Sequence, residues 1–377
     1  MKKIILYNVL CLCVLFNTGC GAISVAAVYD EMTPTYKPSS PTIEMVNTPV
    51  IEITATAVST VAPATEVVHT VPGVTQTIEP LFREERAKTK IRSLMIEYNH
   101  VDEYFLSDEY WNRLYGRISK YGTAKRIVPL EFHSDSYDMY EGVYTMTTES
   151  FREQADYLMS NDYHFLTIHE IQGFVYGWLE LPKRSIILTS DPGPGSRPFE
   201  SISRITGVFS ELESTYGYKP HINIFLVTQG LTEEENYNCK DNICWQSYVN
   251  AVESGYFSLG THTQFHNHHD QTSENVARED ITISVDNIKK NTGIRVYAIS
   301  WPYELCSPHI EMLGDIGITI GFGGWSRSTG TNYVYSQDNL QLCLPRLFPQ
   351  NPDGFSGRPK GLTLEEMLAQ AALDENK

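Results

Sequence analysis

The fold of this chain is decided by a short stretch near its middle, Ser185-Ile-Ile-Leu-Thr-Ser-Asp-Pro-Gly193. Residues 185–189 read as a short strand with the apolar residues Ile186, Ile187 and Leu188, and the stretch ends with residues that form turns. A run that is apolar at successive positions predicts a strand buried on both faces, which is typical of parallel sheets. The polar residues that follow the run therefore lie at the carboxyl end of a buried strand.

The same order of strand and helix repeats on both sides of this stretch. Repeated strand–helix units predict an α/β fold whose parallel sheet is open or closed into a barrel. Strands are expected at residues 128–132, 163–167, 222–227, 257–260, 295–300 and 318–322. Helices are expected at residues 149–159, 168–178, 199–216, 245–254, 273–291 and 309–314, with Gly293 ending the helix at 273–291.

The composition of the 377 residues excludes several classes of protein. The formal net charge is −17, from 46 acidic and 29 basic residues. This charge argues against nucleic acid as a partner, because phosphate binding relies on Lys and Arg, and against a polybasic membrane-surface protein. A hydrophobic content of 41% is typical of globular proteins and excludes a wholly disordered chain.

The first 19 residues have the pattern of a signal peptide. Lys2 and Lys3 precede an apolar stretch over residues 4–16, which is too short for a membrane-spanning helix of about 20 residues. The following Thr-Gly-Cys resembles a bacterial lipobox, in which the cysteine after the cleavage site carries a lipid. We therefore expect export, with lipid anchoring to the bacterial cell membrane through Cys20. Simple secretion and an uncleaved anchor are the alternatives.

The rest of the chain divides by composition. Residues after the signal are rich in Thr, Pro and Val, which predicts a flexible stalk, and the composition changes abruptly at Phe82. The expected parts are the stalk at 20–81, a helical extension of the body at 82–128, the main domain at 129–350, and a tail at 351–377 whose amphipathic helix starts with a capping box of Thr363 and Glu366.

Four cysteines remain after the signal, an even number that fits an oxidising compartment. The short loop between Cys239 and Cys244 would close on itself, which leaves Cys306 to pair with Cys343. Four free thiols are the alternative. A zinc site on these cysteines is disfavoured, because the sequence contains no pair spaced as Cys-x-x-Cys.

Polar residues follow three of the expected strands, in the segments 189–193, 262–266 and 300–304. Active sites of parallel α/β folds lie at the carboxyl ends of their strands, so this location indicates a site. His262 and His266, spaced four residues apart, would share one metal ion if their rings face the same way; otherwise they belong to a polar surface loop. Asp191 is a candidate base or ligand, or simply a turn former.

Taken in order, these segments read Thr-x-Asp-x-Gly, His-Thr-x-x-His and Trp-Pro-Tyr. This set resembles the polysaccharide deacetylase family, also called the NodB homology domain or carbohydrate esterase family 4, over residues 129–350. The resemblance implies a distorted (β/α) barrel that hydrolyses N-acetyl or O-acetyl groups on a polysaccharide. It also implies a divalent metal, usually zinc, that polarises the acetyl carbonyl and activates water.

The resemblance implies a role for individual residues of this chain. Asp191 matches the general base, and His262 and His266 match the two metal-binding histidines. Tyr303 matches the residue whose backbone N–H stabilises the oxyanion, and Pro302 shapes that turn.

Several positions depart from the family pattern. Pro192 stands where the family has a metal-binding Asp, which leaves the site one ligand short of the usual three. Glu304 replaces a Gly, and Ser300 stands where many members have the Arg that orients the base. The late catalytic histidine of the family is missing, because no histidine follows His309.

Other residues are candidates to fill these gaps. His133 is a candidate for the missing acid, and His268, His269 and Asp270 are candidates for the third metal ligand. The sequence therefore predicts a metal-dependent deacetylase that acts on a polymer of acetylated amino sugars. A catalytically degenerate relative that binds glycan, or a structural surface lipoprotein, remains the alternative.

Overall fold

The computed structural model describes residues 75–132, 147–192, 198–232, 243–323, 333–349 and 362–375. All of them belong to one compact unit, residues 69–377. The expected signal peptide, Cys20 and most of the expected stalk lie outside the described residues. None of the described helices is both long enough and apolar enough to cross a membrane.

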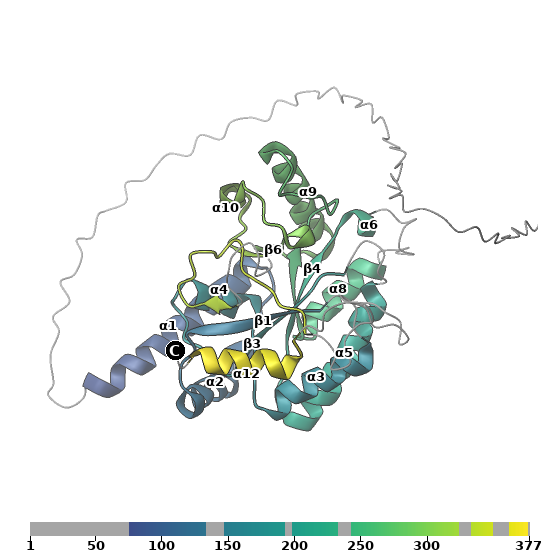
Figure 1. Ribbon diagram of the computed structural model, residues 1–377. Coiled ribbons are helices and arrows are strands. Elements are labelled where there is room, and N and C mark those ends of the chain that lie inside the picture. The colour runs from purple at the N-terminus through teal and green to yellow at the C-terminus, as the bar shows by residue number, and fades with distance from the viewer. Residues whose placement is uncertain are drawn as a thin grey trace, which may run out of the picture. The chain divides into compact units, whose positions relative to one another are not determined.

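A curled sheet of mainly parallel strands forms the centre of the fold (Figure 1). Its strand order is β7-β6-β5-β4-β3-β1-β8, and β2 pairs with β3. Among the strands that the structure describes, only β8 runs antiparallel to its neighbour, β1. The sheet confirms the expected α/β class. The strands are β1 Arg126–Phe132, β2 His164–Phe165, β3 Ser185–Ser190, β4 Ile222–Leu226, β5 Phe257–Thr261, β6 Ala298–Ser300, β7 Ile320–Phe322 and β8 Val334–Tyr335.

Residues 341–347, which we call the closing segment, connect β7, at one edge of this sheet, with β1, near the other edge. The backbone N–H of Gly321 in β7 donates to the carbonyl of Gln341 at 2.8 Å. The N–H of Glu131 in β1, beyond the part of this strand that pairs with β8, donates to the carbonyl of Leu347 at 2.9 Å. The closing segment therefore turns the curled sheet into an incomplete barrel and places its own side chains at the carboxyl ends of the strands.

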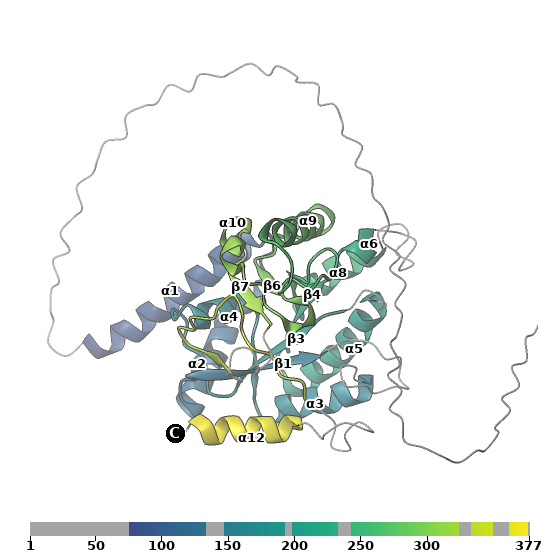
Figure 2. The same cartoon turned by 45° about the horizontal axis from the view of Figure 1, so that its top comes forward.

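Helices lie around the outside of the sheet (Figure 2). Their local starts and stops follow from the sequence. Thr167 and Glu170 form a capping box at the start of α4, and Gly293 ends α9 in the left-handed conformation with a φ of 78°. These helices are α3 Thr148–Ser160, α4 Ile168–Val175, α5 Pro198–Tyr216, α6 Gln229–Thr232, α8 Ile243–Glu253, α9 Glu274–Thr292 and α10 Leu313–Ile316.

Two further helices precede the barrel. They are α1 Thr75–Glu97 and α2 Asp108–Tyr121, with a short 3-10 helix at Tyr104–Leu106 between them. The first helix begins at Thr75, so the last seven residues of the expected stalk are helical, since extending a helix adds backbone hydrogen bonds at little cost once it has formed. The hydroxyl of Tyr98 reaches the carbonyl of Leu259 in β5 at 3.3 Å, which docks this extension on the barrel.

The last described helix, α12 Leu364–Glu375, lies against β1 (Figure 2). Its start has the expected capping box. The N–H of Thr363 donates to Glu366 at 2.8 Å, and the N–H of Glu366 donates to the Thr363 hydroxyl at 3.2 Å. Leu364 and Leu368 are buried and anchor this helix on the barrel.

Candidate active site

Asp191 lies directly after β3 and is only 1% exposed. One of its oxygens, Oδ2, accepts two hydrogen bonds. The donors are the hydroxyl of Ser300 at 2.7 Å, from the end of β6, and Nη1 of Arg346 at 2.6 Å, from the closing segment. The parallel sheet and the closing segment thus bring three remote parts of the chain to one carboxylate.

Arg346 belongs to the site although it lies outside the three motifs that follow strands. Its guanidinium is 1% exposed, and its Nη2 lies 3.0 Å from Oε1 of Glu131 in β1. Arg346 therefore bridges two buried carboxyl groups, Glu131 and Asp191. The Leu-Pro-Arg sequence at 344–346 resembles the closing element of the family, and that was the available signal.

His262 follows β5 and is buried beside Asp191. Its Nδ1 lies 2.8 Å from the backbone carbonyl of Ser300, so Nδ1 carries a proton and Nε2 keeps a lone pair. Burial lowers the pKa of His262 to about 4, although the carboxylate of Asp191 opposes this shift. The ring is therefore neutral near pH 7, and the 3.8 Å approach of Nε2 to Asp191 Oδ2 is not an ion pair there.

His266 lies next to His262, with 4.8 Å between their ring centroids. Burial also lowers the pKa of His266. The two rings meet without a helix, because residues 262–268 form a loop in which Thr263 and His266 have left-handed φ angles of 70° and 55°. The predicted histidine pair is therefore brought together by a loop, and not by the helical turn that the four-residue spacing suggested.

Asp280 of α9 holds this loop in place. Its Oδ1 accepts the backbone N–H groups of Gln264 at 2.7 Å and Phe265 at 2.9 Å. Its other oxygen, Oδ2, lies 3.0 Å from Nε2 of His269, which is fully buried. Asp280 is therefore a positioning residue for the histidine loop, and no motif in the sequence indicated it.

The candidates for a third metal ligand do not form a set with the histidine pair. His269 is turned to Asp280, and the ring of His268 stacks on Tyr303 with 3.6 Å between centroids. Asp270 lies 3.6 Å from Nδ1 of His268. His133 lies outside the described residues. Among the residues that are described, no group of three or more His, Cys, Asp or Glu side chains is arranged to hold a metal ion.

The Trp-Pro-Tyr motif forms a tight turn at the edge of the site. Trp301 and Pro302 are buried, whereas Tyr303 is 50% exposed. Tyr303 and Glu304 both have left-handed φ angles, 57° and 58°. Such angles cost about 1–3 kcal/mol each for residues other than glycine and often occur at functional sites.

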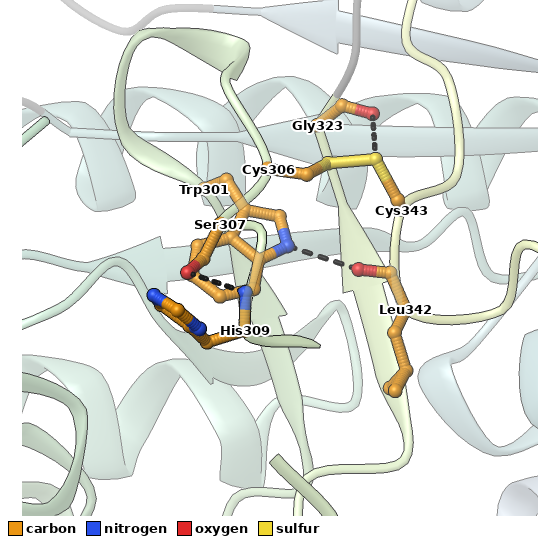
Figure 3. Close-up of a disulfide and its surroundings, with 7 residues drawn as sticks. All are labelled: Trp301, Cys306, Ser307, His309, Gly323, Leu342 and Cys343. Atoms are coloured by element: carbon orange, nitrogen blue, oxygen red, sulfur yellow. Dashed lines mark hydrogen bonds between the residues drawn. A yellow bond between two sulfur atoms is a disulfide. The ribbon is translucent and has the colours of Figure 1, made fainter. Parts of the chain in front are cut away.

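A disulfide connects this turn to the closing segment (Figure 3). Cys306 and Cys343 are joined, with their Cα atoms 6.0 Å apart, which is the pairing expected for the second pair of cysteines. Next to it, Nε1 of Trp301 donates to the carbonyl of Leu342 at 2.9 Å. Cys239, the expected partner of Cys244, lies outside the described residues. The Cys306–Cys343 disulfide thus holds the Tyr303 turn close to the segment that carries Arg346.

Removing this disulfide is expected to destabilise the protein by about 3–4 kcal/mol, since it closes a loop of 37 residues. The double variant Cys306→Ala/Cys343→Ala should show this loss in denaturant unfolding under oxidising conditions. In wild type, a reducing agent should produce at least the same loss. A double variant within about 0.5 kcal/mol of wild type would show that the cross-link does not stabilise the fold.

Comparison with known proteins gives one family and one fold. Residues 179–320 match the family model described as polysaccharide deacetylase. No curated protein matches the sequence significantly.

Among solved structures, a polysaccharide deacetylase from Bacillus cereus is similar with a TM-score of 0.50 and 16% identity, over 66% of this chain and 70% of that one. The deacetylase PplD from Streptococcus pyogenes has a TM-score of 0.49 and 13% identity, over 65% of this chain and 97% of the other. IcaB from Ammonifex degensii has a TM-score of 0.49 and 18% identity, over 66% and 97%.

Proposed function

We propose that this chain, whose residues 179–320 match the family model described as polysaccharide deacetylase, removes acetyl groups from an extracellular glycan by hydrolysis. One observation carries the proposal. The buried carboxylate of Asp191 is held by Ser300 and Arg346 directly beside the neutral ring of His262. A fixed carboxylate next to an imidazole lone pair is an arrangement suited to activating water against an acetyl carbonyl.

In the proposed reaction Asp191 is the general base. It takes a proton from the water molecule that attacks the acetyl carbon, and its hydrogen bonds to Ser300 and Arg346 fix its position during this step. The backbone N–H of Tyr303 makes no hydrogen bond to any residue within the described ranges. It is therefore available to donate to the carbonyl oxygen as negative charge develops there.

We further propose that His262 and His266 bind one divalent cation, most simply zinc. Both rings are neutral near pH 7, which metal ligation requires, and they lie side by side. A bound zinc would polarise the acetyl carbonyl and lower the pKa of water. Pro192 has no side-chain atom that ligates, so the described residues supply two ligands where catalytic zinc sites usually have three. We therefore expect weak metal binding.

The test measures two quantities on the same purified protein. Acetate release from acetylated glucosamine oligomers reports hydrolysis, and titration with zinc reports metal affinity. His262→Ala should reduce zinc affinity about 10-fold or more and remove acetate release, because it deletes one ligand of two. The control His100→Ala, a histidine outside the site, should change neither quantity. Equal zinc affinity in wild type and His262→Ala would refute the proposed metal ligand.

A second function has its own supporting observation. Pro192 and Glu304 replace an Asp and a Gly of the family pattern, and both changes lie at the site. A protein with these changes that binds glycan without hydrolysing it would retain the oligomers yet release no acetate. Export and lipid attachment at Cys20 remain predictions from the sequence.

A further inference from the structure

Two arginines lie side by side at the amino ends of β1 and β3, at the opposite end of these strands from Asp191. Arg126 is the first residue of β1, and Arg184 directly precedes β3. The two strands are parallel, and Val128 pairs with Ile186. Arg126 and Arg184 each lie two residues earlier, so they occupy matching positions on neighbouring strands. Since β1 has seven residues, its two ends lie about 20 Å apart.

The two arginines line a cavity of about 270 Å³, which we call the basic cavity. Lys183 adds a third cationic side chain to its wall, and α12, which packs against β1 (Figure 2), contributes Leu368 and Ala371. The wall therefore combines positive charge with apolar surface. The volume is just below the usual range of about 300–1,000 Å³ for ligand pockets, so it suits a compact ligand.

Arg126 has hydrogen-bond donors that the described part of the chain leaves without an acceptor. Its Nε and Nη2 atoms are both buried, and neither makes a hydrogen bond. The guanidinium lies over the ring of Tyr333, with 4.8 Å from Cζ to the ring centroid. This contact stabilises the positive charge but gives the N–H groups no acceptor. Because a buried donor without an acceptor is costly, a ligand that supplies acceptor oxygens would remove that cost.

The carboxylates near the basic cavity have other partners. Asp162 accepts from Arg117 at 2.9 Å, and Asp374 of α12 accepts from a tyrosine hydroxyl at 3.1 Å. Arg184 donates through Nη1 to a backbone carbonyl at 2.6 Å, which is a neutral acceptor. Within the described ranges, neither Arg126 nor Arg184 forms an ion pair with a carboxylate. Like charges on neighbouring strands are unfavourable, and no carboxylate of the described residues offsets this pair.

We propose that the basic cavity binds a small organic anion whose carboxylate or phosphate group lies between Arg126 and Arg184. Guanidinium groups form paired, charge-assisted hydrogen bonds to the oxygens of either group. The apolar side chains of α12 would contact the rest of the ligand, which favours an organic anion over a bare ion. The cluster of cations is a local exception in a chain whose net charge is −17. This site lies apart from Asp191 and does not depend on the proposed deacetylation.

Calorimetric titration of the whole purified chain, at matched ionic strength, tests the site with defined probes. Glucuronate carries a carboxylate and glucose 6-phosphate carries a phosphate, whereas glucose has a similar ring without charge. At least one of the two anions should bind wild type at a concentration of about 10 mM or below, and glucose should not bind. The anion that binds more tightly identifies the charged group. Inorganic phosphate bound as tightly as the better sugar anion would overturn the organic ligand.

Arginine variants locate the binding. Arg126→Gln and Arg184→Gln should each weaken it by at least about 10-fold, because each removes a charged donor. Arg126→Lys keeps a charge without the planar fork and should give an intermediate affinity. The control Arg92→Gln makes the same change on a half-exposed side chain outside the cavity and should bind as wild type. Arg184→Gln still tests the site if the half-buried Arg126 is needed for folding.

Thermal unfolding gives a second measurement. A ligand that binds only the folded state raises the midpoint of unfolding. The better anion should raise this midpoint in wild type and leave it unchanged in the double variant Arg126→Gln/Arg184→Gln. The proposal fails if neither anion binds wild type, if glucose binds as tightly as the anions, or if both arginine variants keep the wild-type affinity.

Discussion

Replacing Arg346 by methionine is expected to destabilise the protein by about 3–5 kcal/mol, because it leaves buried carboxylates without their counter-charge. The guanidinium is 1% exposed and lies within 3.0 Å of both Glu131 and Asp191. Methionine retains much of the apolar volume but none of the charge. The free energy of unfolding, measured with denaturant at neutral pH, reports the loss directly.

Two comparisons separate charge from packing in this result. Arg346→Lys keeps one positive charge but cannot contact two carboxylates with a rigid fork, so an intermediate loss is expected. Adding Glu131→Gln to Arg346→Met should recover part of the stability, since it removes one of the uncompensated carboxylates. If Arg346→Met had the same free energy of unfolding as wild type, the contacts of Arg346 with Glu131 and Asp191 would not contribute to the stability of the fold.

Replacing Asp191 by asparagine is expected to lower kcat for acetate release by about 10²–10⁴-fold, the usual contribution of a general base. Asparagine has nearly the same shape, and its side-chain oxygen still accepts from Ser300 and Arg346, so the fold should be retained. It cannot take a proton from water. The loss should therefore appear in kcat with little change in KM.

The matched control is Asp315→Asn, which makes the same chemical change on an exposed side chain that pairs with Arg278. It should leave kcat unchanged. Circular dichroism of both variants should match wild type. Activity retained in Asp191→Asn would remove the proposed base, and the reaction would then need another residue in that role.

Much of the site could be predicted because its residues follow strands that are recognisable locally. The run at 185–190 is buried at every position, and β3 indeed ends immediately before Asp191. His262 follows β5 in the same way. Parallel strands place their carboxyl ends along one edge, so residues that follow different strands converge without any further information. Local pattern and a general rule of sheet geometry were sufficient for these positions.

Other features depend on contacts that no local pattern encodes. Arg346 reaches Asp191 across 155 positions of sequence, and it does so because the closing segment bonds to both β7 and β1. A short connection without a helical or strand period carries no periodic signal. Asp280 lies in the expected helix at 273–291, but its contact with the histidine loop depends on how that helix packs against the loop, and no local pattern encodes such packing.

The sequence by itself predicted most of the strands and helices and the positions of Asp191 and the histidine pair, because these follow from residue types at fixed spacing along the chain. The tertiary structure alone decided their protonation states and partners. Burial keeps His262 neutral, and Arg346 bridges Asp191 and Glu131. Proton affinity depends on desolvation and on charges brought near by folding, and neither quantity can be read from neighbours in sequence.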